Sequence, residues 1–162
     1  MEVVVFIGLQ GAGKSTFYRT FFQETHWHIS KDNFRHNKNR ERRQHQLLQE
    51  ALEQGQSVVV DNTNPTRLSR TAIFQVAKQF DAAVIGYHFV TSLKTCLERN
   101  RQREGKERVP DIALFATAKT IEPPAFEEGF RRIYEVEAGE AGAFDVTAKV
   151  LCNAVHDQKR QR

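Results

Sequence analysis

Short continuous apolar runs recur along the chain and predict strands. The first run, which ends at Gly8, is rich in valine and nearly unbroken, a pattern typical of a strand buried on both faces of a parallel sheet. Residues 121–130, which contain two prolines, predict a loop before the last run. The predicted strands are residues 2–8, 27–30, 57–61, 82–90 and 132–136.

Between these runs, apolar side chains recur at the three- to four-residue spacing of an amphipathic helix. Asn64 and Pro65 fit the N-cap and the first position of the third helix. The predicted helices are residues 14–23, 40–53, 64–80, 93–103 and 110–118. Residues 137–162 show no pattern that predicts an element.

Strands that alternate with helices predict an α/β fold, in which helices cover both faces of a mostly parallel sheet of about five strands. The length of 162 residues, with 40% hydrophobic and 27% charged residues, is typical of one soluble domain. We therefore expect a single three-layer α/β/α domain over residues 1–162. Cys96 and Cys152 form neither a disulfide framework nor a metal-ligand pair.

The chain contains no run of about 20 apolar residues and no basic segment before its first apolar run. These features predict a cytoplasmic protein with no membrane partner. The net charge is only +4, but basic residues gather in three clusters, at residues 35–43, 99–108 and 159–162. Such clusters are either solvated helix faces or a surface for a polyanion, and both interpretations stay open.

A glycine-rich segment between the first strand and the first helix carries the clearest chemistry. Gly8 to Ser15 matches the G-x-x-x-x-G-K-[ST] loop, whose backbone N–H groups surround phosphate oxygens. Lys14 would contact the β- and γ-phosphates, and Ser15 would ligate Mg²⁺. The segment therefore predicts a P-loop that binds ATP with Mg²⁺. The predicted contacts are Gly8, Gln10, Gly11, Ala12, Gly13, Lys14, Ser15 and Thr16.

The guanine-specifying N-K-x-D pattern of switch GTPases is missing, because Arg40 occupies the place of its aspartate. A kinase needs a carboxylate near the acceptor hydroxyl, at the strand ends beside the P-loop. Asp32 lies just past the second predicted strand, and Arg35 would fix that carboxylate or bind an acceptor phosphate. The competing interpretation of Asp32 is an ordinary helix N-cap.

Asp61 ends the third predicted strand and points toward the P-loop, as a Mg²⁺-binding Walker-B carboxylate would. The polar residues that follow, Asn62, Thr63 and Asn64, either line the substrate site or cap the next helix. The histidines show no convincing metal-ligand spacing. Trp27, with His26 and His28 beside it, is interpreted as strand packing, and a base-stacking platform is the alternative.

Together these motifs resemble the kinase domain of polynucleotide 5′-hydroxyl kinases, both the phage type and the end-healing animal type. The resemblance covers roughly residues 3–136. The matching segments are the P-loop, Ser30 to Arg35, Asp61 to Pro65, Arg99 to Arg103, Val109-Pro110 and Glu127 to Phe130.

The resemblance implies that Asp32 is the general base for a 5′-hydroxyl and that Arg35 contacts the acceptor phosphate. Thr63 would contact the 3′-phosphate of the accepting nucleotide. Residues 99–118 would form a lid whose arginine contacts the ATP phosphates. We assign this role to Arg103. Arg99 and Arg101 remain competitors, because Glu104 is an extra residue relative to the phage pattern and blurs the register.

Relatives that repair ends often add a phosphatase domain with an Asp-x-Asp pair. No two aspartates of this chain are two positions apart, so we expect no 3′-phosphatase activity in it. The kinase could act in trans with a separate phosphatase or ligase, or it could have drifted to another acceptor. The leading hypothesis is therefore a kinase for the 5′-OH end of DNA or RNA. A small-molecule kinase of the same fold, acting on a nucleoside, sugar or antibiotic, is the first alternative. A nucleotide-binding regulator without transferase activity is the second.

Overall fold

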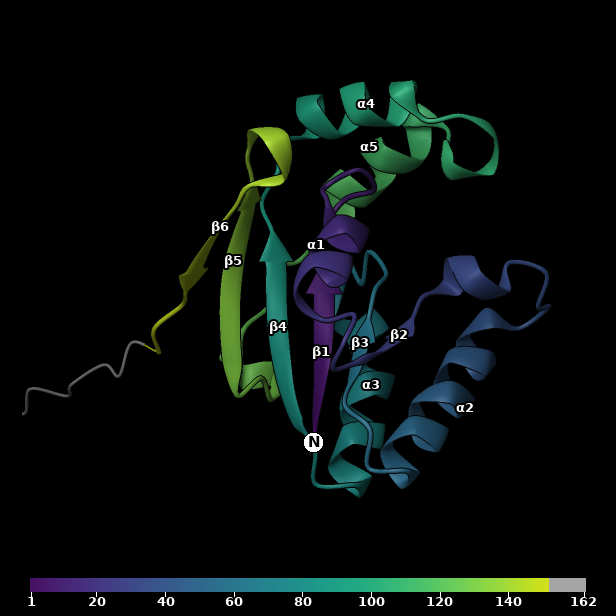
Figure 1. Cartoon of the computed structure of the whole chain (residues 1–162), viewed down its shortest axis with the longest axis vertical. Coiled ribbons are helices and arrows are strands. Elements are labelled where there is room, and N and C mark those ends of the chain that lie inside the picture. The colour runs from purple at the N-terminus through teal and green to yellow at the C-terminus, as the bar shows by residue number, and fades with distance from the viewer. Residues whose placement is uncertain (152–162) are drawn as a thin grey trace, which may run out of the picture.

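A computed structural model gives the fold over residues 1–151. Its strands form one sheet in the order β2-β3-β1-β4-β5-β6 (Figure 1). The first five strands pair in parallel and β6 runs antiparallel to β5. The strands are β1 (Glu2–Ile7), β2 (Trp27–Ile29), β3 (Val58–Val60), β4 (Ala83–Phe89), β5 (Arg132–Ala138) and β6 (Phe144–Ala148).

Helices connect the parallel strands. The α-helices are α1 (Lys14–Phe21), α2 (Arg40–Glu53), α3 (Arg67–Gln79), α4 (Leu93–Gln102) and α5 (Asp111–Thr120). Short 3₁₀ helices are η1 (Lys31–Phe34), η2 (Gly105–Glu107), η3 (Phe126–Glu128) and η4 (Glu140–Gly142). None of the described helices is long and apolar enough to cross a membrane.

The alternation of side chains along β1 divides the core into two layers. Val3, Val5 and Ile7 pack with the apolar faces of α2 and α3, whereas Val4 and Phe6 pack with α1 and with buried residues of α4 and α5. This is the period-2 pattern of a strand buried on both faces. The predicted α/β fold with three layers is confirmed.

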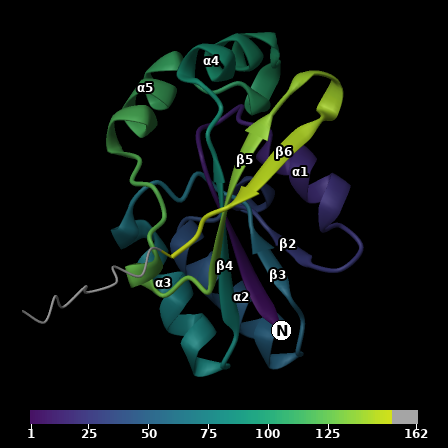
Figure 2. The ribbon, with the colours of Figure 1, turned by 90° about the vertical axis from the view of Figure 1, so that its left-hand side faces the viewer.

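The edge of the sheet at which the parallel strands end positions the site. The glycine-rich segment follows β1, η1 follows β2 after Ser30, and Asp61 follows β3. Helices α4 and α5 lie beyond this edge (Figure 1), and the turn between β5 and β6 reaches the same end of the molecule (Figure 2). Ligands of open α/β sheets bind at this edge.

The predicted start of the third helix was wrong. Its N-cap is Thr66, whose side chain accepts a hydrogen bond from the Ser69 N–H at 3.0 Å. Asn64 instead has a positive φ of 42°, and its side-chain amide donates to the Phe6 carbonyl at 2.8 Å. Because the Asn64 side chain is hydrogen-bonded to β1, it cannot cap the helix, which begins at Arg67 after the N-cap Thr66.

The segment for which the sequence predicted no element adds a sixth strand to the expected five. Chain beyond Val136 completes β5, turns through η4 and returns as β6. Phe144 at the start of β6 packs edge-on against Phe17 of α1, with ring centroids 5.1 Å apart. The third basic cluster and Cys152 lie outside the described residues, and Cys96 is a buried free thiol.

Candidate phosphate-binding and acceptor site

The glycine-rich segment has the backbone of a phosphate-binding loop. Gly11 and Gly13 adopt φ values of 81° and 95°, which L side chains rarely adopt. A Cβ atom at Gly11 would also lie 2.9 Å from the Cys96 carbonyl oxygen of α4. Both glycines are therefore required for the turn, and the buried Ala12 between them accepts a hydrogen bond from the Thr91 hydroxyl at 3.2 Å.

Lys14 bends back over this loop. Its Nζ donates to the carbonyl oxygens of Gly8 at 3.0 Å and Leu9 at 2.6 Å. Burial lowers the pKa of Lys14 from 10.5 to about 8, although the nearby Asp61 carboxylate opposes the shift. A charged ammonium held in this buried place is poorly compensated, so an incoming polyphosphate would gain a strong electrostatic partner.

Ser15 and Asp61 meet where the predicted metal site lies. The Ser15 hydroxyl donates to Asp61 Oδ2 at 2.9 Å, and Asp61 is only 4% exposed. No three His, Cys, Asp or Glu side chains of residues 1–151 group into a metal site. Mg²⁺ does not need such a group, because it usually binds one or two carboxylates, substrate phosphates and several waters. A hydroxyl beside a carboxylate fits this ion.

His28 is a site residue that sequence reasoning missed. Its Nε2 lies 2.8 Å from Asp61 Oδ2, and its ring stacks on Tyr18 with centroids 4.1 Å apart. The sequence interpretation as strand packing described only part of its role. Register explains the contact, since β2 pairs in parallel with β3 and His28 is opposite Val59.

Asp32 is exposed and does not cap the 3₁₀ helix in which it lies. The N-cap of η1 is Ser30, whose hydroxyl accepts from the Asp32 N–H at 3.3 Å, so the alternative that Asp32 caps the helix was wrong. The Asp32 side chain is 72% exposed, and its Oδ1 lies 3.6 Å from Arg35 Nη2. Arg35 Nη1 also donates to the Lys106 carbonyl of η2 at 2.8 Å, which brings the two basic clusters together.

The polar residues after Asp61 have different places. The Asn62 side chain is hydrogen-bonded within the protein. Its Oδ1 accepts from the Lys31 N–H at 2.9 Å and its Nδ2 donates to Gln44 Oε1 at 2.7 Å. Asn64 is 4% exposed and bonded to the sheet. Thr63 is partly exposed, and only its backbone carbonyl is fixed, by the Gly8 N–H at 3.1 Å.

The three candidate lid arginines separate by helix face. Arg99 Nη1 donates to the Gly11 carbonyl of the P-loop at 3.2 Å. Arg103 lies four positions later, is the C-cap of α4, and borders the same region. Arg101 lies between them in sequence and instead faces Asp111, with an Nη2 to Oδ2 distance of 3.3 Å.

Two cavities flank the P-loop. The larger, of about 490 Å³, brings together the predicted residues for phosphate, metal and acceptor. They include Gln10, Lys14, Ser15, Asp32, Arg35, Asp61, Asn62, Thr63, Asn64 and Arg103. Gln10 also donates from Nε2 to the Thr117 hydroxyl of α5 at 3.4 Å, which connects the P-loop with α5.

The smaller cavity, of about 270 Å³, lies between the P-loop and the β5–β6 turn. Its walls include Gly13 and Thr16 on one side, Arg99 and Arg103 above, and the turn from Gly139 to Phe144 opposite. The sequence predicted the first two walls and not the third, because residues after 136 carry no motif.

Comparison with known proteins identifies the family. Residues 3–124 match the family described as an AAA domain. The chain belongs to this family. It is 28% identical over 141 residues to the bifunctional polynucleotide phosphatase/kinase of Schizosaccharomyces pombe, and 32% identical over 145 residues to a putative bifunctional polynucleotide phosphatase/kinase of Acanthamoeba polyphaga mimivirus. Each match covers 83% of this chain and 33% of the relative, so the chain spans about one third of their length.

Solved structures share the fold. A fungal RNA kinase superposes with a TM-score of 0.68 at 18% identity, over 95% of this chain and 77% of that one. A gluconokinase from Sinorhizobium meliloti superposes with a TM-score of 0.58 at 22% identity, over 84% of this chain and 82% of that one. The chain therefore has the fold of P-loop kinases, and the resemblance to polynucleotide kinases is confirmed by the curated relatives.

Proposed function

We propose that the chain is an ATP-dependent kinase that transfers the γ-phosphoryl group to the 5′-hydroxyl of a polynucleotide. The single observation that supports this most is the larger cavity, in which Lys14 and Ser15 of the P-loop share one space with Asp32 and Arg35. A site that only binds a nucleotide has no need of an exposed carboxylate facing the phosphates.

The donor half holds ATP through the P-loop backbone, Lys14 and the N-terminus of α1. Ser15 and Asp61 are the residues that would hold Mg²⁺, whose role is to neutralise charge on the β- and γ-phosphates. Asp61 would first have to share its Oδ2 atom, which Ser15 and His28 contact at 2.9 and 2.8 Å. The smaller cavity, beyond Gly13, would take the nucleobase.

The acceptor half would hold the 5′-terminal nucleotide. The Asp32 carboxylate accepts the proton of the 5′-hydroxyl as that oxygen bonds to the γ-phosphorus. The bond from the γ-phosphorus to the β,γ-bridging oxygen breaks, and ADP leaves with the electron pair. Arg35 binds the acceptor phosphate in place of the Lys106 carbonyl, and Thr63 donates its hydroxyl to the same nucleotide.

Residues 99–118 would act as the lid. We assign to Arg103 the neutralisation of charge on the transferred phosphoryl group, because it borders both cavities. Arg99 would support the nucleotide on the base side, where it already contacts Gly11. Arg101 has no such role, since Asp111 engages it at the surface.

A polynucleotide fits this site better than a small acceptor because the larger cavity continues into exposed basic residues. Arg40 at the start of α2 and Lys106 of η2 both line its walls, and Lys38, Arg42 and Arg108 are exposed beside them. The curated relatives named for polynucleotide chemistry support the same choice.

An acceptor panel tests the proposal. We expect label from [γ-³²P]ATP to appear on 5′-OH DNA or RNA oligonucleotides, not on gluconate, nucleosides or aminoglycosides. Activity on oligonucleotides should fall steeply as salt rises, because basic side chains displace counterions from phosphates. Transfer to a small acceptor alone would favour the small-molecule kinase, and ATP binding without transfer to any acceptor would favour the regulator.

A further inference from the structure

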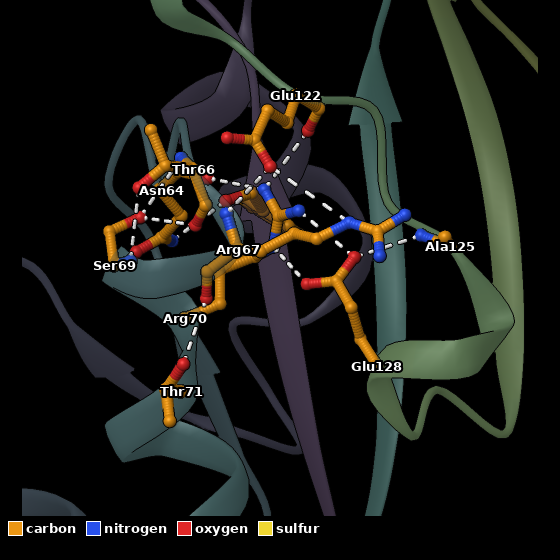
Figure 3. Close-up of polar contacts among 10 residues, drawn as sticks. Asn64, Thr66, Arg67, Ser69, Arg70, Thr71, Glu122, Ala125 and Glu128 are labelled. Atoms are coloured by element: carbon orange, nitrogen blue, oxygen red, sulfur yellow. Dashed lines mark hydrogen bonds and ion pairs between the residues drawn. The ribbon is translucent and has the colours of Figure 1, made fainter.

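A buried ion pair beside the site has no part in the steps above. Arg70 of α3 is 0% exposed. Its Nε and Nη2 donate to the two carboxylate oxygens of Glu128 at 2.8 and 3.0 Å (Figure 3). Glu128 also accepts from the Ala125 N–H at 2.9 Å. A buried bidentate pair of this kind fixes geometry closely and tolerates the loss of a partner poorly.

The remaining nitrogen of Arg70 reaches the backbone of two other segments. Nη1 donates to the carbonyl oxygen of Asn64 at 2.9 Å and to that of Glu122 at 3.1 Å. Asn64 belongs to the loop after β3, and Glu122 lies on the segment that leaves α5 of the lid (Figure 3). One guanidinium therefore connects α3 with the loop after β3 and with the segment that follows α5.

The loop from Asn62 to Pro65 is held through its carbonyl groups. Each of its four carbonyls accepts a hydrogen bond, and Arg70 is the one charged donor. The donors in chain order are Asn64 Nδ2 at 3.5 Å, Gly8 N at 3.1 Å, Arg70 Nη1 at 2.9 Å and Glu122 N at 2.6 Å.

Asn64 sits at φ 42°, in the left-handed region that few non-glycine residues adopt and that asparagine adopts more readily than most. Thr63 lines the larger cavity, while the carbonyls of the loop accept hydrogen bonds from the protein.

We propose that Arg70, oriented by Glu128, is a positioning residue for the acceptor. It fixes the loop that carries Thr63 and connects that loop to the base of the lid. The inference rests on the proposed function, because it assigns the loop to acceptor binding. It also gives a physical role to the Glu127 to Phe130 motif, which the sequence matched to the animal enzymes without any function.

Matched lysine variants on one helix test the proposal. Arg70→Lys keeps the positive charge but cannot bind Glu128, Asn64 and Glu122 at once. Arg67→Lys is the control, because Arg67 is an exposed residue of α3 whose ion pair with Glu122 is 3.9 Å long. For Arg70→Lys we expect the KM for a 5′-OH oligonucleotide to rise on the order of tenfold. The KM for ATP should stay near the wild-type value in both variants.

A merely structural role would give a different pattern. If Arg70→Lys lowers thermal stability but leaves the oligonucleotide KM unchanged, or raises both KM values together, the inference is wrong. Glu128→Gln guards against a misfolded Arg70 variant, since the amide keeps the shape and one accepting oxygen. It should raise the oligonucleotide KM by less than Arg70→Lys does, and an unchanged KM in a folded Glu128→Gln protein would also contradict the inference.

Hydrogen exchange separates this inference from the proposed function. If wild-type protein phosphorylates no oligonucleotide, the proposed function fails by itself. The loop can still be examined through the two backbone amides that donate to its carbonyls, those of Gly8 and Glu122. Arg70→Lys should speed the exchange of these amides and leave α1 and the Arg67→Lys protein unchanged. Equal exchange in all three proteins would show that Arg70 does not hold the loop.

Discussion

The two halves of the site are built in different ways. The centre of the donor half lies within one segment, Gly8 to Thr16, whose shape follows from glycines with positive φ and from a lysine bonded to its own loop. The acceptor half joins residues from separate elements. Asp32 and Arg35 follow β2, whereas Thr63 follows β3.

Long-range polar contacts hold the acceptor half in place. Arg35 reaches Lys106, which is 71 positions away, and Arg70 reaches Glu128, which is 58 positions away. A local motif can thus bind the phosphates of many substrates, whereas the acceptor depends on how the whole fold brings loops together. Substitutions in the donor half should weaken every reaction of ATP, and substitutions in the acceptor half should act on one substrate.

The largest expected effect in the donor half is at Lys14. Lys14→Met removes the positive charge that faces the β- and γ-phosphates, so kcat/KM should fall on the order of 10³-fold with any acceptor. Steady-state kinetics with ATP measures the loss. Lys78→Met on the exposed end of α3 is the control and should keep full activity. Similar kinetics in the two variants would show that Lys14 does not act on the ATP phosphates.

Arg103 should show that the lid serves transfer more than binding. Arg103→Ala should lower kcat at least about 10²-fold, because the charge that develops on the phosphoryl group loses its partner. Arg101→Ala removes a neighbouring charge that pairs with Asp111 and should have little effect. Single-turnover rates measure both. A larger loss in Arg101→Ala would show that Arg101, not Arg103, neutralises the charge on the phosphoryl group.

The buried charge of Lys14 should also lower the stability of the nucleotide-free protein. Its folded pKa, about 8, is below the ordinary 10.5, so between these pH values the unfolded chain binds more protons. Its burial therefore destabilises the fold below pH 8, and the penalty disappears as pH rises toward 10.5.

Nucleotide-free Lys14→Met should accordingly be more stable than wild type by about 3 kcal/mol at pH 7, with a smaller difference at pH 10. Denaturant unfolding at several pH values measures the difference. A wild-type protein that is the more stable of the two at pH 7 would show that the bonds of Lys14 to Gly8 and Leu9 outweigh its desolvation.

The smallest expected effect concerns the β5–β6 turn. Phe144→Ala should raise the KM for ATP by about three- to tenfold, because the wall of the smaller cavity loses an aromatic ring. The KM for the acceptor should not change. Val146→Ala, an exposed position of the same strand, is the matched control. An unchanged KM for ATP in Phe144→Ala would show that the turn does not contact the nucleotide.

The sequence predicted the strand, the glycine loop and the helix around Lys14 well, because that information is local. A buried strand, a glycine loop and a helix start form one pattern, and the structure places Lys14 and Ser15 as that pattern requires. Asp32 and Arg35 could be named because they follow a strand end, but their partner at Lys106 could not, since no spacing rule connects η1 with η2.

The sequence also missed features that depend on tertiary context. Thr66 rather than Asn64 caps α3 because Asn64 is drawn to the carbonyls of Phe6 and Val60. Strand β6 has mostly exposed side chains, so it lacks the apolar run that marked the other strands. His28 looked like strand packing because its bond to Asp61 depends on the pairing of β2 with β3.

The central claim is that Asp32 takes the proton of the acceptor hydroxyl. Single-turnover transfer from ATP to a 5′-OH oligonucleotide, by wild-type and Asp32→Asn protein side by side, tests it directly. Asparagine keeps the shape of the side chain and cannot accept that proton, so the rate should fall about 10²- to 10⁴-fold while ATP binds with unchanged affinity. An Asp32→Asn protein that transfers phosphate at the wild-type rate would contradict the account.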